Sequence, residues 1–254
     1  MIYFLHIPKT SGTSLQKSIF KACEDFYPQS AVLGEFSRIF HFKNENELEL
    51  FFKTTINQIK NSTLPYIQGH YGCTPYSYIK DIKAFSLIRD PLERVISDFS
   101  YTNNFQNNNF SKPVYEKFLY YMFDRKNTQV NYLTGKWEWQ INNSRFALIH
   151  PELSFKDLLI HIKKHNITLS TVENRNLLIS DLEKALTEAC SKEIVIDSQI
   201  KENVTSFKID ISFIPKRSIT DFKKANHLEY QLYDYVKNHE SLFSAPLRPE
   251  DIKI

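Results

Sequence analysis

The chain has 254 residues, of which 42% are apolar and 24% charged, and its formal net charge at pH 7 is only +3. This length suffices for one large domain spanning 1–254 with a substantial core. The weak and dispersed positive charge argues against a nucleic-acid binder. No apolar run approaches the ~18 residues of a membrane span, so stable membrane insertion is not expected.

The cysteines are sparse and far apart, at Cys23, Cys73 and Cys190. This spacing argues against a disulfide framework and against a zinc site, so we expect no metal. Lys9 interrupts the first apolar run, which excludes a signal peptide at this position. We therefore expect a reduced, cytoplasmic protein.

Short apolar runs alternate with longer amphipathic runs along the chain. The predicted strands are Tyr3–His6, Tyr66–His70, Ala84–Ile88, Ile167–Val172 and Ile194–Ile196. The predicted helices are Thr13–Asp25, Glu45–Lys60, Leu92–Tyr101, Pro113–Phe123, Glu152–His165, Asn174–Cys190 and Asp221–His239. The alternation predicts an α/β fold of three layers, with a central parallel sheet flanked by helices. In such sheets ligands collect at the carboxyl ends of the strands.

The first predicted strand runs into a turn that carries a lysine, a glycine and several hydroxyl groups before a helix begins. The hydroxyl residues are Thr10, Ser11, Thr13 and Ser14. A strand, a turn of small residues and a helix present backbone N–H groups to an anion. Lys9 adds a positive charge, and Gly12 lets the backbone approach a ligand. The lysine precedes the glycine, so this is no Walker A loop, and an ordinary Ser/Thr helix cap remains the alternative to a phosphate site.

A second strand-turn-helix segment begins at Ala84 and carries Arg89 where the strand ends. Asp90 can cap the following helix, Pro91 suits its first turn, and Ser97 lies two turns in. A guanidinium and a hydroxyl in this arrangement can bind a phosphate. The alternative is that Arg89 pairs with a structural carboxylate.

A histidine ends the predicted strand between these two segments, in the sequence Gly69-His70. It is either a structural histidine or a general base with a pKa near neutrality at the same sheet edge.

Together the three segments resemble the sulfotransferases that use 3′-phosphoadenosine-5′-phosphosulfate (PAPS), and most closely the carbohydrate branch with the heparan sulfate 2-O- and uronyl 2-O-sulfotransferases. The family's phosphosulfate loop, H-x-P-K-T-[GA]-[GS]-T-S, is matched by 6–14, with Ser11 where Ala or Gly is usual. Its 3′-phosphate motif, R-D-P-x-x-R-x-x-S, is matched by 89–97, and Gly69-His70 matches its G-H element. The resemblance extends from about Tyr3 to about Phe243.

The resemblance implies a P-loop-like fold, PAPS as donor and adenosine 3′,5′-bisphosphate as product. It makes His70 the general base and Lys9 the residue that stabilises the leaving oxygen. The nucleotide-binding residues it implies are Lys9, Thr10, Ser11, Gly12, Thr13, Ser14, Arg89 and Ser97. Lys216 and Arg217, in a predicted loop after Pro215, either contact the nucleotide as a late basic loop does in the family or form a solvated charge pair.

The acceptor is expected to be a hydroxyl group of a glycan or a small molecule, bordered by 103–112 and 135–143. Trp137 and Trp139 either stack on a sugar ring or pack in a core or lid. A P-loop-like kinase and a non-catalytic nucleotide- or glycan-binding protein are the alternatives. The sequence does not indicate an oligomeric state.

Overall fold

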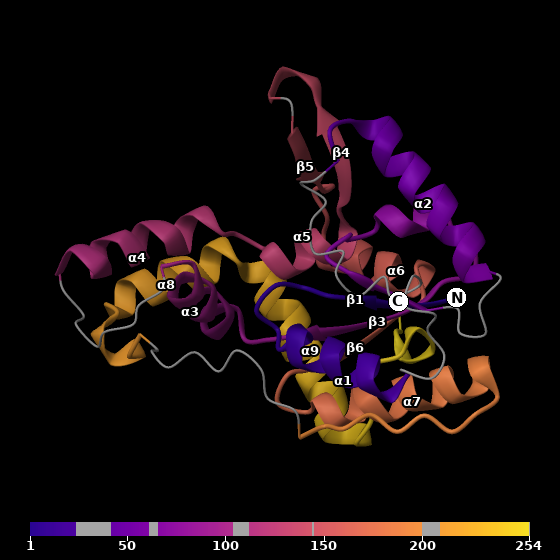
Figure 1. Cartoon of the computed structure of the whole chain (residues 1–254). Helices are drawn as coiled ribbons and strands as arrows, with labels where there is room; N and C mark the ends of the chain where they lie inside the picture. Colours follow the sequence, from indigo (N-terminus) through magenta and orange to yellow (C-terminus); the bar gives the residue numbers. More distant parts are fainter. Residues whose placement is uncertain (24–41, 61–65, 104–111, 144, 200–208, 254) are drawn as a thin grey trace.

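The computed structural model describes residues 1–23, 42–60, 66–103, 112–143, 145–199 and 209–253 (Figure 1). The predicted polar loop 103–109 lies outside the described residues except for Asn103, and so does the end of the first predicted helix.

A four-stranded parallel sheet forms the centre of the fold, in the order β2-β1-β3-β6. The strands are β1 (Ile2–Leu5), β2 (Tyr66–Gly69), β3 (Lys83–Ile88) and β6 (Ile167–Thr171). They are almost entirely buried, as expected for parallel strands covered on both faces. These are four of the five predicted strands.

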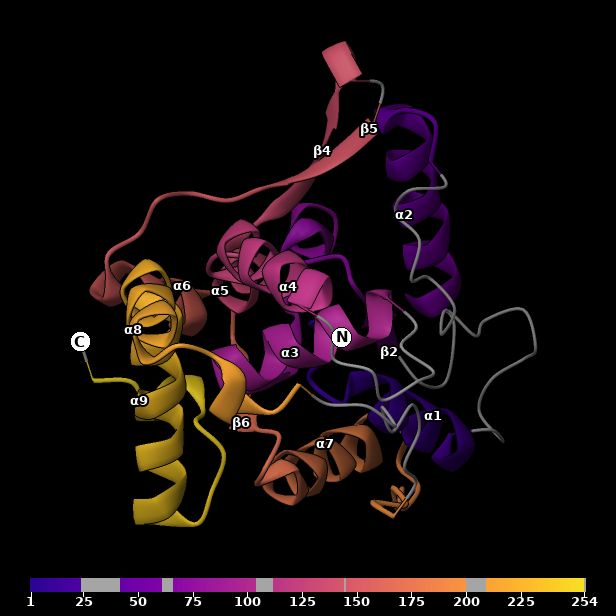
Figure 2. The same cartoon turned by 90° about the vertical axis from the view of Figure 1, so that its left-hand side faces the viewer.

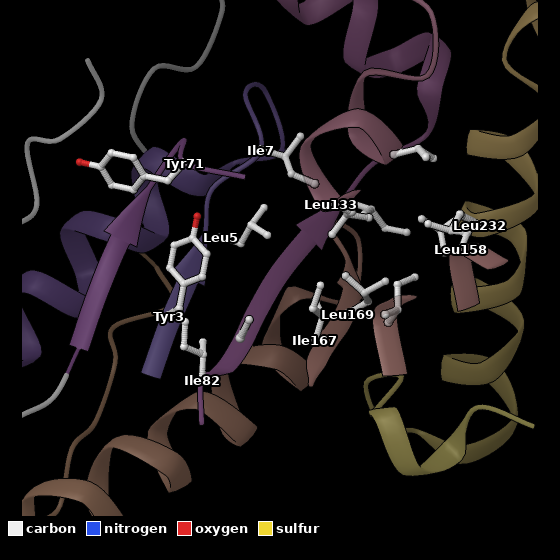
Figure 3. Close-up of a cluster of buried hydrophobic side chains, with 14 of the residues drawn as sticks. Tyr3, Leu5, Ile7, Tyr71, Ile82, Leu133, Leu158, Ile167, Leu169 and Leu232 are labelled. Atoms are coloured by element: carbon white, nitrogen blue, oxygen red, sulfur yellow. The ribbon is translucent and has the colours of Figure 1, made fainter. Parts of the chain in front are cut away.

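Helices cover both faces of this sheet, which confirms the three-layer α/β prediction (Figure 1). Ile2 and Phe4 point to the face covered by α1 (Gly12–Ala22) and α7 (Arg175–Cys190). Tyr3 and Leu5 point to the opposite face (Figure 3), because successive side chains of a strand alternate. That face is covered by α2 (Glu45–Lys60), α5 (Thr128–Thr134), α6 (Phe155–Lys164) and α9 (His227–Phe243).

Three further helices pack together beside the sheet: α3 (Pro91–Thr102), α4 (Lys112–Asp124) and α8 (Lys216–Ala225) (Figures 1 and 2). Their shared core includes Val95, Phe99, Phe118 and Phe222. An antiparallel hairpin of β4 (Lys136–Gln140) and β5 (Arg145–Ile149), which was not predicted, projects from the body beside α2. None of the described helices has both the length and the apolar character needed to cross a bilayer.

The predicted strand Ile194–Ile196 was wrong. Both isoleucines are buried, but their backbone N–H groups donate to side chains of α7 instead of a sheet ladder. Ile194 N donates to Thr187 Oγ1 at 3.0 Å and Ile196 N to Glu183 Oε1 at 2.7 Å. An apolar, extended segment looks the same in sequence whether its hydrogen bonds go to a strand or to side chains.

Two helix predictions also need correction, and α5 was not predicted as a helix. The helix predicted over Asp221–His239 is two helices, α8 and α9, which meet at the buried Asn226. Its Oδ1 accepts a hydrogen bond from Asn127 N at 2.7 Å, a contact between distant parts of the chain. The other helix begins at Phe155 instead of Glu152, because Ser154 and Asp157 form a capping box.

Candidate active site

The carboxyl ends of three adjacent parallel strands meet at one edge of the sheet. Leu5 lies opposite Gly69, and His6 N donates to Gly69 O at 3.0 Å, so β1 and β2 end side by side. β3 pairs with β1 on its other side. The structure therefore brings together the segments that carry Lys9, His70 and Arg89, each of which follows one of these strand ends.

The turn after β1 is wound tightly before α1 begins at Gly12. Lys9 and Ser11 both have left-handed backbones, with φ of 69° and 59°. Non-glycine residues adopt this conformation at a cost of about 1–2 kcal/mol, so the surrounding contacts must hold it. Ser11 occupies the cap position, but its side chain makes no capping hydrogen bond, so the alternative of an ordinary hydroxyl cap does not describe this turn. Alternating right- and left-handed residues form a concave set of N–H groups suited to an anion.

The hydroxyl groups of this turn have different surroundings. Thr10 is buried and its Oγ1 donates to Ile7 O at 2.8 Å, which holds the turn closed. Ser11 and Thr13 are half-buried, and Ser14 is buried in the first turn of α1. Thr10 therefore supports the shape of the turn through its side chain.

The imidazole of His6 fills the space in front of Gly12. A Cβ at Gly12 would lie only 2.0 Å from His6 Cδ2 and 2.3 Å from His6 Nε2. His6 is 4% exposed, and its ring centroid lies 4.1 Å from that of His70. Burial and the neighbouring His70 lower the pKa of His6 well below its usual value. Glycine at position 12 thus allows the turn to pack closely against His6, whose ring in turn lies against His70.

Two residues that are distant in the sequence, His6 and Trp137, form hydrogen bonds with His70. Its Nδ1 lies 2.6 Å from His6 O, and since a carbonyl oxygen only accepts, Nδ1 carries the hydrogen. The neutral ring then has its lone pair on Nε2. Burial lowers the pKa of His70, against the opposing effect of the bond to His6, and Trp137 Nε1 donates to His70 O at 2.8 Å. A neutral imidazole with a defined basic nitrogen is the form that a general base requires.

Both tryptophans contact the hydrophobic core. Trp137 and Trp139 are partly buried against the core, and the Trp139 ring lies edge-on to Phe146 at 5.1 Å. Through its bond to His70, Trp137 ties the hairpin to the strand edge.

Lys9 reaches across to α3. Its Nζ lies 3.7 Å from the centroid of the Tyr101 ring, a cation–π contact. Burial lowers the pKa of Lys9, Asp98 opposes this shift, and the nearby positive charge of Arg89 adds to it. Lys9 and Arg89 are thus close enough for their charges to interact.

Arg89 lies directly beyond β3, and its Nη2 contacts Glu93 Oε2 at 3.2 Å. Arg89 therefore does pair with a carboxylate, as the alternative interpretation of this residue requires. The side chain of Arg89 is 17% exposed and that of Glu93 is 37% exposed, so the guanidinium is largely covered while its partner is open to solvent. The helix start is as predicted, since Asp90 Oδ1 accepts from the backbone N–H groups of the second and third helical residues.

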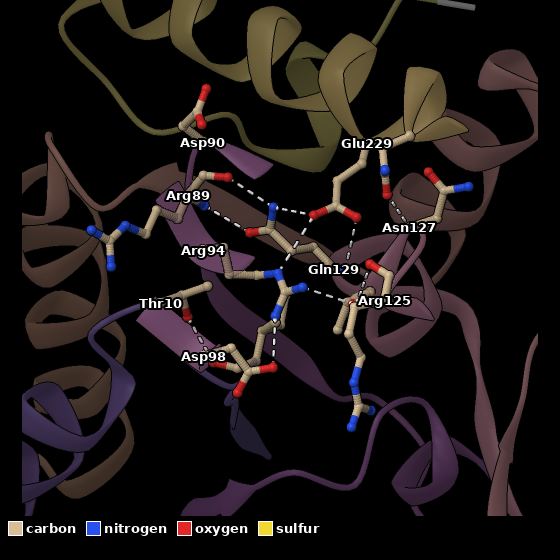
Figure 4. Close-up of polar contacts among 12 residues, drawn as sticks. Thr10, Arg89, Asp90, Arg94, Asp98, Arg125, Asn127, Gln129 and Glu229 are labelled. Atoms are coloured by element: carbon tan, nitrogen blue, oxygen red, sulfur yellow. Dashed lines mark hydrogen bonds and ion pairs between the residues drawn. The ribbon is translucent and has the colours of Figure 1, made fainter. Parts of the chain in front are cut away.

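A buried polar network behind Arg89 was not predicted (Figure 4). Gln129 of α5 contacts the backbone of Arg89 and also Glu229 of α9. Arg94, 1% exposed, lies with its Nε 3.8 Å from Glu229 Oε1 and donates from Nη2 to Thr128 Oγ1. Only a polar residue on an otherwise apolar helix face, such as Glu229 beside Leu228 and Leu232, could have indicated this network in the sequence.

Lys216 and Arg217 do not form the predicted loop, because they begin α8 directly after Pro215. A helix was missed here because the first turn of α8 has little apolar periodicity. Arg217 is 94% exposed and lies 3.8 Å from Asp221 of its own helix. The described contacts fit a solvated charge pair and join neither residue to Lys9, His70 or Arg89. Ser97 is half-buried on α3, in the same helix as the partners of Lys9.

A family model described as "Sulfotransferase family" matches residues 1–236. The chain belongs to the sulfotransferase family. The match includes the turn after β1, His70 and the Arg89 segment, and it ends within α9 of this sulfotransferase. Membership of this family supports sulfuryl transfer in general and implies an acceptor that carries a hydroxyl group. A search of curated proteins found no match to this sulfotransferase. Among the residues that the structure describes, no group of three or more His, Cys, Asp or Glu side chains is arranged to hold a metal ion.

Proposed function

We propose that this sulfotransferase moves a sulfuryl group from PAPS to a hydroxyl acceptor, a sugar or polysaccharide. The observation that carries the proposal is the meeting of the Lys9 turn, His70 and Arg89 at the ends of three adjacent strands. PAPS has two separate anionic ends, and this edge has two separate basic groups.

In the proposed complex the turn Lys9–Ser14 and the N-terminus of α1 bind the 5′-phosphosulfate. Arg89 and Ser97 bind the 3′-phosphate. Holding both ends fixes the rotation of the donor, so that the sulfur faces the acceptor and the reaction becomes effectively intramolecular.

The proposed transfer is a single in-line displacement. The acceptor oxygen forms a bond to sulfur while the bond between sulfur and the bridging oxygen breaks. The bonding pair remains on that oxygen, and adenosine 3′,5′-bisphosphate leaves. Lys9 stabilises the developing negative charge, and Nε2 of His70 takes the proton of the acceptor hydroxyl. The Nδ1–His6 hydrogen bond supports this role, because it leaves Nε2 as the basic nitrogen.

In this proposal the acceptor binds along the hairpin of β4 and β5, beside His70. Its first strand begins beside His70, through the bond from Trp137, and it contains most of the segment 135–143 expected at the acceptor rim. A sugar bound along the hairpin would present its hydroxyl to Nε2. The cytoplasmic location stays a prediction of the sequence.

Calorimetric titration with adenosine 3′,5′-bisphosphate tests the donor. Lys9→Ala and Arg89→Ala should lose detectable binding, whereas Lys21→Ala, which removes an exposed lysine from the far end of α1, should not. His70→Ala should bind the nucleotide as the parent does and lose turnover. Folded parent protein with no affinity for the nucleotide would refute the proposal.

Two outcomes would favour the alternatives. If ATP with Mg²⁺ displaced the bisphosphate at lower concentration, a kinase would be indicated. If labelled PAPS bound without transfer to any of a broad acceptor panel, a non-catalytic binding protein would be indicated.

A further inference from the structure

The backbone of Arg89 lies one residue beyond the sheet. The ladder between β3 and β6 ends at Ile88, which lies opposite Thr171. The N–H and C=O groups of the next residue therefore lack strand partners, although a buried peptide group needs hydrogen bonds.

The side chain of Gln129 supplies both bonds. Its Oε1 accepts from Arg89 N at 2.7 Å, and its Nε2 donates to Arg89 O at 2.8 Å. The amide thus contacts Arg89 as a neighbouring strand would. Its orientation is unambiguous, because a flipped amide would oppose donor to donor and acceptor to acceptor.

The carboxylate of Glu229 holds this amide from behind. Gln129 Nε2 also donates to Glu229 Oε1 at 2.7 Å, and Gln129 N approaches Glu229 Oε2 at 3.3 Å. Gln129 and Glu229 are 1% and 2% exposed. Glu229 is itself held near the buried Arg94, so the amide has little freedom to move.

We propose that Gln129 is a positioning residue for 3′-phosphate recognition, acting by fixing the peptide unit from which the Arg89 side chain extends. This inference rests on the proposed function. Arg89 has a long side chain, and among the described residues its guanidinium is paired with the partly exposed Glu93, so its reach toward a phosphate depends on where its backbone is held. Binding that requires a fixed group loses affinity when that group must first be ordered.

The test compares two nucleotides that differ only at the 3′ position, adenosine 3′,5′-bisphosphate and adenosine 5′-monophosphate. Gln129→Met keeps the length and volume of the side chain but removes the amide. It should weaken binding of the bisphosphate by about 10- to 100-fold, the range of one charge-assisted hydrogen bond. Binding of the monophosphate should be unchanged. With PAPS, KM should rise while kcat at saturation stays within about twofold of the parent value.

Val130→Ala is the matched control, because this buried core residue is the next residue of α5. It should lower the melting temperature and leave the preference for the bisphosphate intact. Should Gln129→Met fail to fold, Gln129→Asn keeps the buried amide but is too short to span both Arg89 groups, and it should show the same selective loss.

A folded Gln129 variant that preferred the bisphosphate as strongly as the parent would overturn the inference and leave the proposed function standing. A parent protein with no preference for the bisphosphate would overturn the assignment of Arg89 itself, and with it the proposed function.

Discussion

Replacing Gly12 by alanine should disturb the active site through His6. The new Cβ would lie 2.0 Å from His6 Cδ2 and 2.8 Å from His6 Cγ, far inside contact distance. The imidazole cannot simply turn away, because it is buried and packed against the ring of His70. The ring must therefore shift together with its neighbour.

The expected change in the free energy of unfolding is the balance of two opposing effects. Overpacking a closely packed interior typically costs about 1–3 kcal/mol. Alanine recovers at most about 1 kcal/mol of this through its better helix propensity, since Gly12 begins α1. We expect Gly12→Ala to lower the free energy of unfolding by about 1–2 kcal/mol, or the melting temperature by roughly 2–8 °C.

Urea unfolding of four proteins measures this as a double-mutant cycle: the parent, Gly12→Ala, His6→Ala and the double variant. His6→Ala removes the ring that clashes, so the Gly12→Ala penalty should vanish in that background. The coupling free energy should be about 1–2 kcal/mol in favour of the double variant. Turnover of Gly12→Ala should also fall, because the displaced ring moves His70.

Additive effects in this cycle would refute the reasoning, since they would mean that the Cβ and the imidazole do not compete for the same space. A Gly12→Ala protein with parental stability and turnover would do the same.

Three further substitutions test the contacts around the site. Trp137→Phe removes the hydrogen-bond donor to His70 O. It should lower turnover and reduce the free energy of unfolding by about 1 kcal/mol, while nucleotide affinity stays unchanged; equal turnover in the parent and the variant would contradict this. Glu229→Leu removes one of the two carboxylates near the buried Arg94, since Asp98 remains 3.7 Å from its Nη1, and also removes the acceptor of Gln129 Nε2. It should therefore cost about 1–3 kcal/mol in urea unfolding; a loss below about 1 kcal/mol would show that the Glu229 contacts are dispensable. Burial and the adjacent His165 lower the pKa of His161 from 6.5 to about 4. The unfolded chain then binds the proton first, so this contribution is present above pH 6.5 and is lost as the pH falls toward about 4. His161→Gln should flatten that part of the stability profile relative to the parent, and parallel profiles would exclude the assignment.

Much of the fold could be predicted because its signals are local. The apolar runs of β1, β2, β3 and β6 are buried strands wherever they lie in the sheet, and their alternation with amphipathic helices predicts parallel pairing. The start of α3 was predictable because Asp90 and Pro91 act on neighbouring backbone groups. The hairpin was missed, since its strands mix polar and aromatic residues. The break at Asn226 depends on a contact with Asn127.

The residue types of the candidate site were likewise determined by the sequence alone: a lysine turn, a histidine and an arginine, each directly after a strand. Their relation to one another was decided by the tertiary structure. The position of the proton on His70 depends on the carbonyl group of His6, 64 residues away in the sequence. The backbone of Arg89 is held by the amide of Gln129, 40 residues away, and that amide is held by the carboxylate of Glu229, a further 100 residues along the chain. A local pattern specifies which groups are available. Hydrogen-bond partners and close ring contacts arise only when the sheet and its helices bring distant segments together.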